Sequence, residues 1–281
     1  MIRENDQAAG LRGSKRPPRV VRLKPGGQGT HVIAVTSGKG GVGKTQVSAN
    51  LAVELARAGK RVLVLDADLG LASMDLAFGV SPQYNLLSVL TAERTIDEIL
   101  VEGPEGVHLI PACPGRYDVA NLDARQRAAL WDLVEEVAQD FDVLIIDTGA
   151  GIGSNAVGFA SYADDVLLVT TPDPTSLRDA YAMAKVLHRR AGVDRVHVVA
   201  NQVSSEREGA EIHARMDGIV RRFLMLELGY LGAIPRDDSV REGVATGQPF
   251  VLRAPTSMAA RAVSHLVRRL KVLEATEAHP C

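Results

Sequence analysis

One short stretch of the chain carries the residue types that a phosphate-binding loop needs. The run from Gly38 to Thr45 has glycines at both ends and closes on a lysine and a threonine. Glycines let backbone N–H groups turn inward around phosphate oxygens, and a helix N-terminus adds positive potential. We expect Lys44 to neutralise the β- and γ-phosphates and the Thr45 hydroxyl to ligate Mg²⁺. The nucleotide-binding residues predicted here are Gly38, Gly40, Gly41, Val42, Gly43, Lys44, Thr45 and Gln46.

Carboxylates directly follow two apolar runs of the chain. Asp66 and Asp68 come after the run that ends at Leu65. Asp147 comes after the run that ends at Ile146. Ligands of an open parallel sheet bind beyond the carboxyl ends of its strands, so these side chains are expected near the phosphate loop. Carboxylates there can orient a water on Mg²⁺ or position an attacking water. The alternative is structural, with Asp66 and Asp68 only capping the turn that follows them.

The elements that must position these residues follow from the pattern of apolar residues. Six short runs are mostly apolar on both faces, as strands covered by helices on both sides must be. These runs are residues 32–35, 62–65, 107–110, 143–146, 166–169 and 196–199. Segments of helical period lie between several of them, at Val47 to Ala58, Ala124 to Gln139 and Leu177 to Arg190. The alternation predicts an α/β fold, a single domain with one mostly parallel sheet and helices on both faces.

Composition divides the chain into three parts. Residues 1–29 combine prolines and glycines with little that could pack, which predicts a flexible arm. Residues 30–273 form the predicted phosphate-loop domain, in which Gly59 is expected as the left-handed cap of the first helix. Residues 274–281 are predicted to be a disordered tail. The arm carries the cations Arg12, Lys15, Arg16, Arg19, Arg22 and Lys24, besides Arg3 near its start.

Charge and cysteine content exclude several classes of protein. The net charge of −2 and the pI near 6.4 give no global positive field for nucleic acid. Cys113 and Cys281 lie far apart and fit neither a disulfide framework nor a cluster site, which disfavours iron–sulfur relatives of the fold. No apolar run approaches the length of about 18 residues that a membrane span requires. We therefore expect a cytoplasmic protein whose membrane contact, if any, is peripheral.

The loop from Lys39 to Thr45 resembles the deviant phosphate loop of the MinD/ParA ATPases, and the resemblance covers residues 31–270. It implies Mg²⁺-dependent ATP hydrolysis, with ATP or ADP bound and an ATP-dependent homodimer. In that family the first lysine reaches the nucleotide of the second subunit, so Lys39 is expected to act in trans. The other reading of Lys39 is a solvated charge. The catalytic residues implied are Lys39, Lys44 and Asp68, and the metal-binding residues are Thr45, Asp66 and Asp147.

The same resemblance assigns the adenine contacts. An amide side chain offers both a donor and an acceptor to a base edge, and Asn201 follows the sixth apolar run. From spacing alone Asn201 would be an ordinary turn residue. The family pattern adds the loop formed here by Pro235, Arg236 and Asp237.

Within this family, three stretches resemble the flagellar-number regulators known as FlhG, FleN or YlxH. They are residues 66–72, 147–153 and 173–182. In the last one, Thr175 or Ser176 is expected to cap the helix that follows. In the arm, residues 6–12 resemble the motif by which FlhG proteins stimulate the GTPase FlhF, although a coincidental match in a tail is the alternative. The partner-activating residues implied are Asp6, Gln7, Leu11 and Arg12.

The resemblance leaves a choice of function. Regulation of flagellar number or placement comes first, with a flagellar switch protein or a transcription regulator as a further partner. A ParA-type DNA-partition ATPase needs a basic surface, for which the arm and Arg215, Arg221 and Arg222 are candidates. A MinD-type division-site ATPase is the third reading. The segment Met258 to Leu273 is amphipathic and either packs on the sheet or binds anionic lipid, which would recruit the protein reversibly to the membrane or a cell pole.

Overall fold

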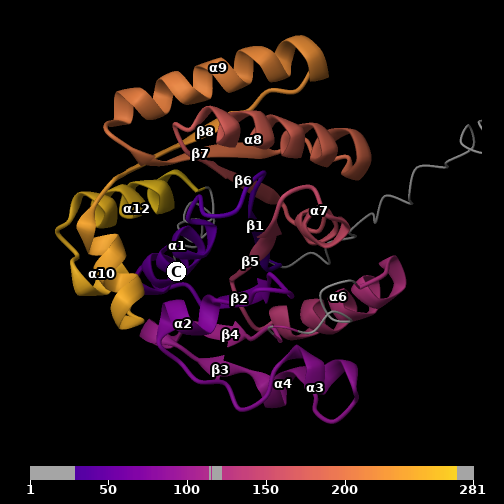
Figure 1. Ribbon diagram of the computed structural model, residues 1–281. Helices are drawn as coiled ribbons and strands as arrows, with labels where there is room; N and C mark the ends of the chain where they lie inside the picture. Colours follow the sequence, from indigo (N-terminus) through magenta and orange to yellow (C-terminus); the bar gives the residue numbers. More distant parts are fainter. Residues whose placement is uncertain (1–28, 114, 116–121, 271–281) are drawn as a thin grey trace, which may run out of the picture.

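A twisted sheet forms the centre of the computed structural model, which describes residues 29–113, 115 and 122–270 (Figure 1). Within those residues the sheet has eight strands in the order β3-β4-β2-β5-β1-β6-β7-β8. Only β3 and β4 pair antiparallel, and the other neighbours are parallel. The strands are β1 (His31–Ser37), β2 (Val62–Ala67), β3 (Val101–Glu102), β4 (His108–Ile110), β5 (Val143–Ala150), β6 (Asp165–Thr170), β7 (Val196–Val203) and β8 (Gly229–Pro235).

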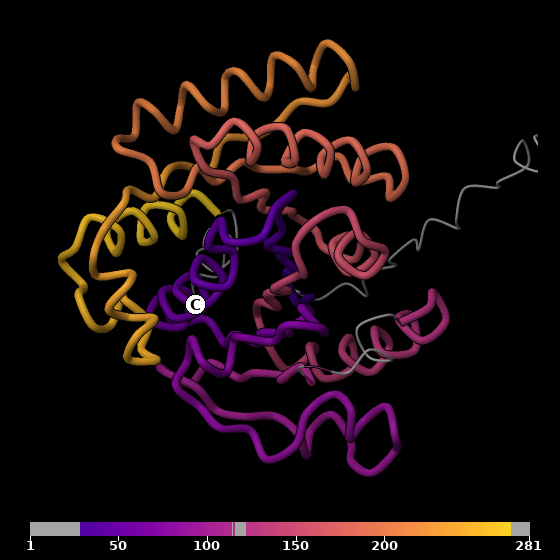
Figure 2. The backbone as a smooth tube through the Cα atoms, viewed as in Figure 1, coloured from indigo at the N-terminus to yellow at the C-terminus, as the bar shows by residue number. Residues whose placement is uncertain are grey.

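Helices cover both faces of the sheet, as the twin apolar faces of its strands require (Figure 2). On one side lie α6 (Ala124–Ala138), α7 (Ser154–Ala160), α8 (Pro174–Val186) and α9 (Glu206–Leu224). On the other side lie α1 (Lys44–Arg57), α2 (Met74–Phe78), α11 (Phe250–Arg253) and α12 (Met258–Arg269). The shorter elements are α3 (Leu86–Leu90), α4 (Ile96–Ile99), α10 (Asp238–Thr246), the 3₁₀ turn η2 (Pro104–Gly106) and the π-helical turn η3 (Leu187–Ala191).

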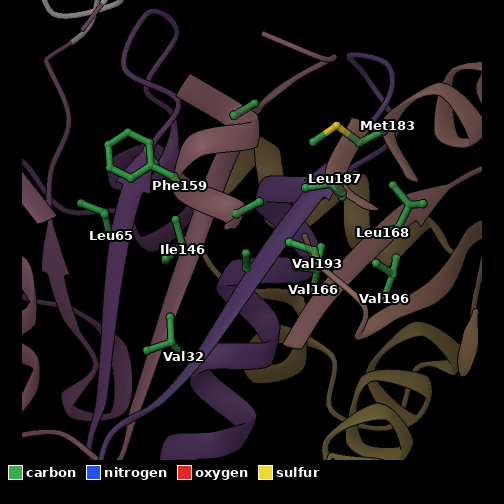
Figure 3. Packing of buried hydrophobic residues seen from close by; sticks show 14 of the residues in the cluster. Val32, Leu65, Ile146, Phe159, Val166, Leu168, Met183, Leu187, Val193 and Val196 are labelled. Carbon is green, nitrogen blue, oxygen red and sulfur yellow. The ribbon is translucent and has the colours of Figure 1, made fainter. Parts of the chain in front are cut away.

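Two hydrophobic cores result, one on each face of the sheet. Successive residues of β1 serve opposite cores, with Val32 on the α6–α9 side and Ile33 on the α1–α12 side. Figure 3 shows the first core, in which Phe159 of α7 lies above Leu65 and Ile146. The two cores thus pack against both faces of the strands, and the candidate site lies at the ends of these strands.

The last described helix, α12, belongs to the amphipathic segment that was expected either to pack on the sheet or to bind lipid. In α12, Ala259, Val263, Leu266 and Val267 are buried in the second core. Its apolar stripe is therefore used for packing on the sheet. No helix within the described ranges is both long and apolar enough to cross a membrane.

The predicted fold class and the six predicted strands are confirmed. Gly59 has a φ of +84°, as expected of a left-handed cap. Two details were wrong. The strands β3 and β8 were missed, and the cap of α8 is neither Thr175 nor Ser176. Asp173 caps α8 instead and accepts a hydrogen bond from the Thr175 backbone N–H at 2.7 Å. The residue after it, Pro174, suits the first helical position because its missing N–H needs no partner there.

The division of the chain into arm, domain and tail stays a prediction, because the described residues begin at 29 and end at 270. The arm up to residue 28, the tail from 274 to 281 and Leu273 lie outside them. The site residues predicted in the arm, Asp6, Gln7, Leu11 and Arg12, therefore also lie outside the described residues.

We expect Phe159→Ala to lower the free energy of unfolding by about 3–5 kcal/mol, because it removes a fully buried ring and leaves a cavity. Urea-induced unfolding measures the change. Phe223→Ala is the matched control, since the Phe223 side chain on α9 is 56% exposed and its loss should stay within about 0.5 kcal/mol. Equal losses in the two variants would contradict the packing described here.

Candidate nucleotide-binding site

The phosphate loop connects β1 to α1 and is held from two sides. A Cβ atom on Gly38 would lie 2.0 Å from the carbonyl oxygen of Asp179 in α8, so only glycine permits this approach. Gly43 has a φ of +90°, and a Cβ there would lie 2.5 Å from Nδ2 of Asn201 in β7. The close approach of α8 also requires a small side chain at the buried Ala180. The contact is made by the backbone of Asp179, so it gives a reason for the small residue at 180 and none for the aspartate side chain.

The start of α1 is tied to the end of β5 by hydroxyl groups. The Thr45 hydroxyl donates to Asp147 Oδ2 at 2.7 Å, and the Ser48 hydroxyl donates to Asp147 Oδ1 at 2.8 Å. Asp147 is fully buried and Lys44 is only 8% exposed. Burial raises the pKa of Asp147, and the opposing influences come from Lys44, Thr45 and Ser48. Ser48 was missed at the sequence level, since nothing but its place one turn after Lys44 signals it.

Asp66 lies beside Asp147, because the two residues are register partners on β2 and β5. Asp66 accepts hydrogen bonds from the backbone N–H groups of Asp68, Ser73 and Met74, each at 3.1 Å. Burial, and then the charge of Asp147, raise the pKa of Asp66 to about 7, even though these donors favour the charged form of Asp66. Ser73 was also missed, and its hydroxyl lies 3.3 Å from the Thr45 hydroxyl.

This set of side chains suits a magnesium ion. Mg²⁺ prefers oxygen ligands and is usually held by one or two carboxylates, with waters and substrate phosphates completing its shell. Thr45, Asp66 and Asp147 supply one hydroxyl and two carboxylates next to the phosphate loop. No group of three or more His, Cys, Asp or Glu side chains within the described ranges could hold a metal by itself.

Asp68 differs from its two neighbours because its carboxylate is not used for structure. It is partly exposed, and no hydrogen bond or ion pair of this side chain occurs within the described residues. Its Oδ1 atom lies close to Gly149 in the last part of β5, where a Cβ would be 3.5 Å away. The capping role that remained open for Asp68 is thus not used in this structure.

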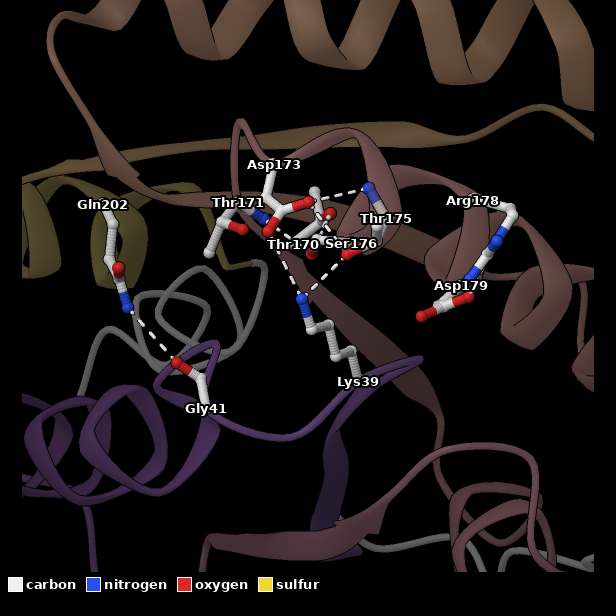
Figure 4. Close-up of polar contacts among 10 residues, drawn as sticks. All are labelled: Lys39, Gly41, Thr170, Thr171, Asp173, Thr175, Ser176, Arg178, Asp179 and Gln202. Atoms are coloured by element: carbon white, nitrogen blue, oxygen red, sulfur yellow. Dashed lines mark hydrogen bonds and ion pairs between the residues drawn. The ribbon is translucent and has the colours of Figure 1, made fainter.

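Lys39 points from the phosphate loop toward the start of α8 (Figure 4). Its Nζ atom donates to Thr175 Oγ1 at 2.7 Å and lies 3.3 Å from Asp173 Oδ2. The Thr175 hydroxyl is the largest influence that lowers the pKa of Asp173 to about 2, followed by the Thr175 backbone and Lys39. The Lys39 side chain is still 41% exposed, so this surface contact is weak.

A cavity of about 210 Å³ opens beside Lys39. Its walls are the phosphate loop, the segment from Thr171 to Asp173, Gln202 and Arg236. Gln202 has a φ of +59° and its Nε2 atom donates to the Gly41 carbonyl oxygen at 3.4 Å. The Arg236 Nε atom donates to the Gln202 carbonyl oxygen at 2.9 Å. Gln202 was missed at the sequence level, although it directly follows Asn201.

The residues predicted to contact adenine are brought to this edge, but Asn201 and Asp237, like Arg236, have other partners here. Asn201 Nδ2 donates to the Val42 carbonyl oxygen at 2.7 Å, and its Oδ1 accepts from the Gln202 backbone N–H. Asp237 caps α10 through Ser239 and also accepts from the Ala259 backbone N–H at 3.1 Å. Pro235 ends β8. Gln46 lies in α1, where its carbonyl oxygen accepts from Asn50.

Comparison with known proteins agrees with this geometry. The sequence profile of the ParA family, described as NUBPL iron-transfer P-loop NTPase, matches residues 28–271. The protein named antiactivator FleN from Pseudomonas aeruginosa is 42% identical over 85% of this chain and 85% of its own length. The flagellum site-determining protein YlxH from Helicobacter pylori is 37% identical over 84% and 80%.

Solved structures agree with these sequence matches. The site-determining protein MinD of Pyrococcus horikoshii, complexed with Mg-ADP, has a TM-score of 0.74 at 27% identity and covers 89% of this chain and 100% of its own. MinD in the MinC:MinD complex of Aquifex aeolicus has a TM-score of 0.70 at 29% identity, over 90% and 98%. The chain therefore belongs to the MinD/ParA family of P-loop ATPases, in the branch that contains FleN and YlxH (FlhG).

Proposed function

We propose that this ATPase is a switch that pairs with a second copy of itself when ATP is bound, and that this switch regulates flagellar number or placement. The names of the two relatives just described support the flagellar part, since one is an antiactivator called FleN and the other a flagellum site-determining protein. The geometry of the phosphate-loop site supports the pairing of two copies.

The position of the Lys39 side chain supports the proposed pairing of two copies. Lys44 already provides the buried cation of the cradle, whereas Lys39 projects from the loop to the exposed start of α8. A second cation on this rim is well placed to reach the phosphates of a facing copy. In related phosphoryl-transfer systems a cation supplied in trans raises the rate by about 10³–10⁵.

Exposed apolar side chains support a partner on the same edge of the sheet. Leu71 follows β2 and is 78% exposed, and Ile152 follows β5 and is 54% exposed. Both belong to the loops that carry Asp68 and the end of β5. Covering such side chains with a second copy would remove apolar area from water in the ATP-bound state only.

The proposed roles follow the geometry. Thr45, Asp66 and Asp147 would hold Mg²⁺, which when bound neutralises charge on the phosphates. Lys44 stabilises the same phosphates from within the chain. Asp68, whose carboxylate is unengaged, positions the attacking water. Mg²⁺ and ADP are the ligands named for the Pyrococcus horikoshii MinD structure.

The adenine contacts proposed for Asn201, Pro235, Arg236 and Asp237 require a local exchange of partners. Asn201 would have to release the Val42 carbonyl oxygen, to which its amide now donates. Arg236 already lines the cavity beside the loop and needs no such release. We propose that nucleotide binding moves the end of β7 in this way, which would link base recognition to the loop conformation.

The flagellar function also assigns partners and a location. Through Asp6, Gln7, Leu11 and Arg12 the arm would activate an FlhF-type GTPase, with Gln7 orienting a water and Arg12 countering charge. A flagellar switch protein or a transcription regulator would be a further partner. The site of action would be the cytoplasm, with recruitment to the membrane or a cell pole through partners, because the apolar face of α12 is buried.

DNA partition is the less favoured function on structural grounds. Of the three arginines proposed for a DNA surface, Arg221 is already engaged by Asp217 and by Glu227. The Arg222 guanidinium lies over the Phe223 ring. Neutralised or stacked guanidinium groups contribute less to phosphate binding than free ones.

We expect Lys39→Ala to bind ATP as tightly as the unchanged chain yet remain a monomer with ATP and Mg²⁺. The reason is that Lys44 is the buried cation of the chain's own cradle, whereas the Lys39 amine is held at the start of α8 by Thr175 and Asp173 and would complete the partner's site. Calorimetry measures the affinity and light scattering the mass. Lys185→Ala, which removes an exposed lysine of α8, is the control and should pair normally. Normal ATP-dependent pairing of Lys39→Ala would remove the trans role.

The flagellar assignment is tested with a synthetic peptide of residues 1–20 added to the cognate FlhF-type GTPase. We expect GTP hydrolysis to accelerate, and a peptide carrying Gln7→Ala to give little acceleration because the group that orients water is lost. If neither peptide changes the rate of GTP hydrolysis, the arm is not a GTPase activator. Division-site selection and DNA partition would then be as well supported as the flagellar function.

A further inference from the structure

A second hollow, far from the phosphate loop in the chain, lies between the α3–α4 segment and α6. Its volume is about 700 Å³, and its apolar lining includes Val89, Ile96, Leu133 and Val137. Leu133 is 44% exposed there, on the face of α6 that points away from the buried Leu130, Trp131, Val134 and Ala138. We call this hollow the α4–α6 groove. Ile96 is buried, so Leu133 is the main apolar side chain of the floor that is open to water, and a docked segment would cover it.

The walls of the α4–α6 groove are strongly acidic. Five carboxylates line it, namely Glu93, Asp97, Glu98, Glu136 and Asp140. The one cation in the lining, Arg94, is paired with Glu98 at 3.6 Å and also contacts Tyr84. Within the described part of the chain the other four carboxylates form no ion pair. An occupant of this groove must therefore combine apolar side chains with several positive charges.

We propose that the occupant is the basic part of the chain's own N-terminal arm, residues 11–24. This segment has six cations, at Arg12, Lys15, Arg16, Arg19, Arg22 and Lys24. Apolar residues stand among them, at Leu11, Val20, Val21 and Leu23. It thus offers both kinds of side chain that an occupant of the groove needs, apolar ones for the floor and cations for the acidic walls.

The arm joins the domain beside the groove. The Thr30 hydroxyl donates to the carbonyl oxygen of Ala138, the last residue of α6, and the His31 N–H donates to the Asp142 carbonyl oxygen. Ala138 stands between Val137 and Asp140, which both line the groove. Lys24 precedes Gly29 by five residues, a span of up to about 17 Å when extended. That span exceeds the width of a helix, about 10–12 Å, so the arm can reach the groove from its anchor.

Tethering favours the chain's own arm over a separate basic peptide. A segment joined by a short linker has an effective concentration in the millimolar range, so a few exposed ion pairs and a modest apolar contact suffice to hold it. Docking of residues 11–24 would also cover the last two residues of the 6–12 motif. This consequence, that a GTPase must compete with the groove for the arm, rests on the proposed function; the docking itself does not.

Carbodiimide crosslinking of the full chain tests the docking, because it joins a lysine to a carboxylate only in direct contact. Lys15 and Lys24 are the lysines of the arm. We expect peptide mapping to find them joined to the acidic residues of the groove. Mixing isotope-labelled and unlabelled chains distinguishes the chain's own arm from that of a second copy, and crosslinks of mixed isotope composition would overturn docking within one chain.

Matched variants separate the groove from the rest of α6. Asp97→Asn with Glu136→Gln should reduce these crosslinks roughly tenfold, since two exposed ion pairs are lost and each contributes a factor of up to about five. Asp132→Asn, an exposed carboxylate of α6 outside the groove lining, should leave the yield unchanged. Equal yields in both variants would overturn the proposal, as would crosslinks only to carboxylates elsewhere.

A second measurement does not depend on lysine chemistry. Trypsin cleaves after Arg19 and Arg22, and docking should slow both cleavages in the intact chain. Asp97→Asn with Glu136→Gln should release this protection by a similar factor of roughly ten. Circular dichroism and thermal unfolding confirm that the variant is folded. Cleavage at the same rate in the unchanged chain and the variant would contradict the docking.

Discussion

The burial of two carboxylates side by side constrains the rest of this structure. Asp66 and Asp147 are register partners on β2 and β5 and are almost completely buried. Neighbouring buried charges are unfavourable unless donors or a cation compensate them. The first turn of α1 supplies Thr45 and Ser48 to one carboxylate, and the backbone after β2 supplies three N–H groups to the other. The geometry of the phosphate loop and of the segment after β2 thus depends on one pair of side chains.

Through this pair of carboxylates, binding of a cation and nucleotide would affect the exposed loops that follow β2 and β5. In the proposed function a divalent cation next to the two carboxylates relieves their repulsion, and the segments that carry Leu71 and Ile152 respond. These exposed apolar residues lie on the edge that would face a second copy. Lys39 belongs to the same edge, because Gly38 allows α8 to approach the loop and leaves the lysine at the start of that helix. The proposed nucleotide site, the proposed pairing surface and Lys39 therefore lie at one edge of the sheet.

Sequence reasoning predicted most of the strands that end at this edge, because buried parallel strands are apolar on both faces. It missed β8, whose residues Gly229 to Pro235 are poor in β-branched side chains, and β3, which has two residues. It missed Ser48, Ser73 and Gln202 because their roles depend on contacts between separate segments. It placed the cap of α8 on the wrong residue, although the order of Asp173 and Pro174 was visible. The acidic groove could not be predicted, since its walls come from α3–α4 and α6.

The central claim is that each catalytic site is shared between two copies, and complementation tests it most directly. A Lys39→Ala chain keeps its cradle but lacks the trans cation, whereas a Lys44→Ala chain keeps Lys39 but lacks the cradle's cation. Each should hydrolyse ATP poorly alone. Measured together at equal concentrations, they should regain ATPase activity, because one mixed site combines an intact cradle with an intact Lys39. A mixture no more active than the separate chains would contradict a shared site.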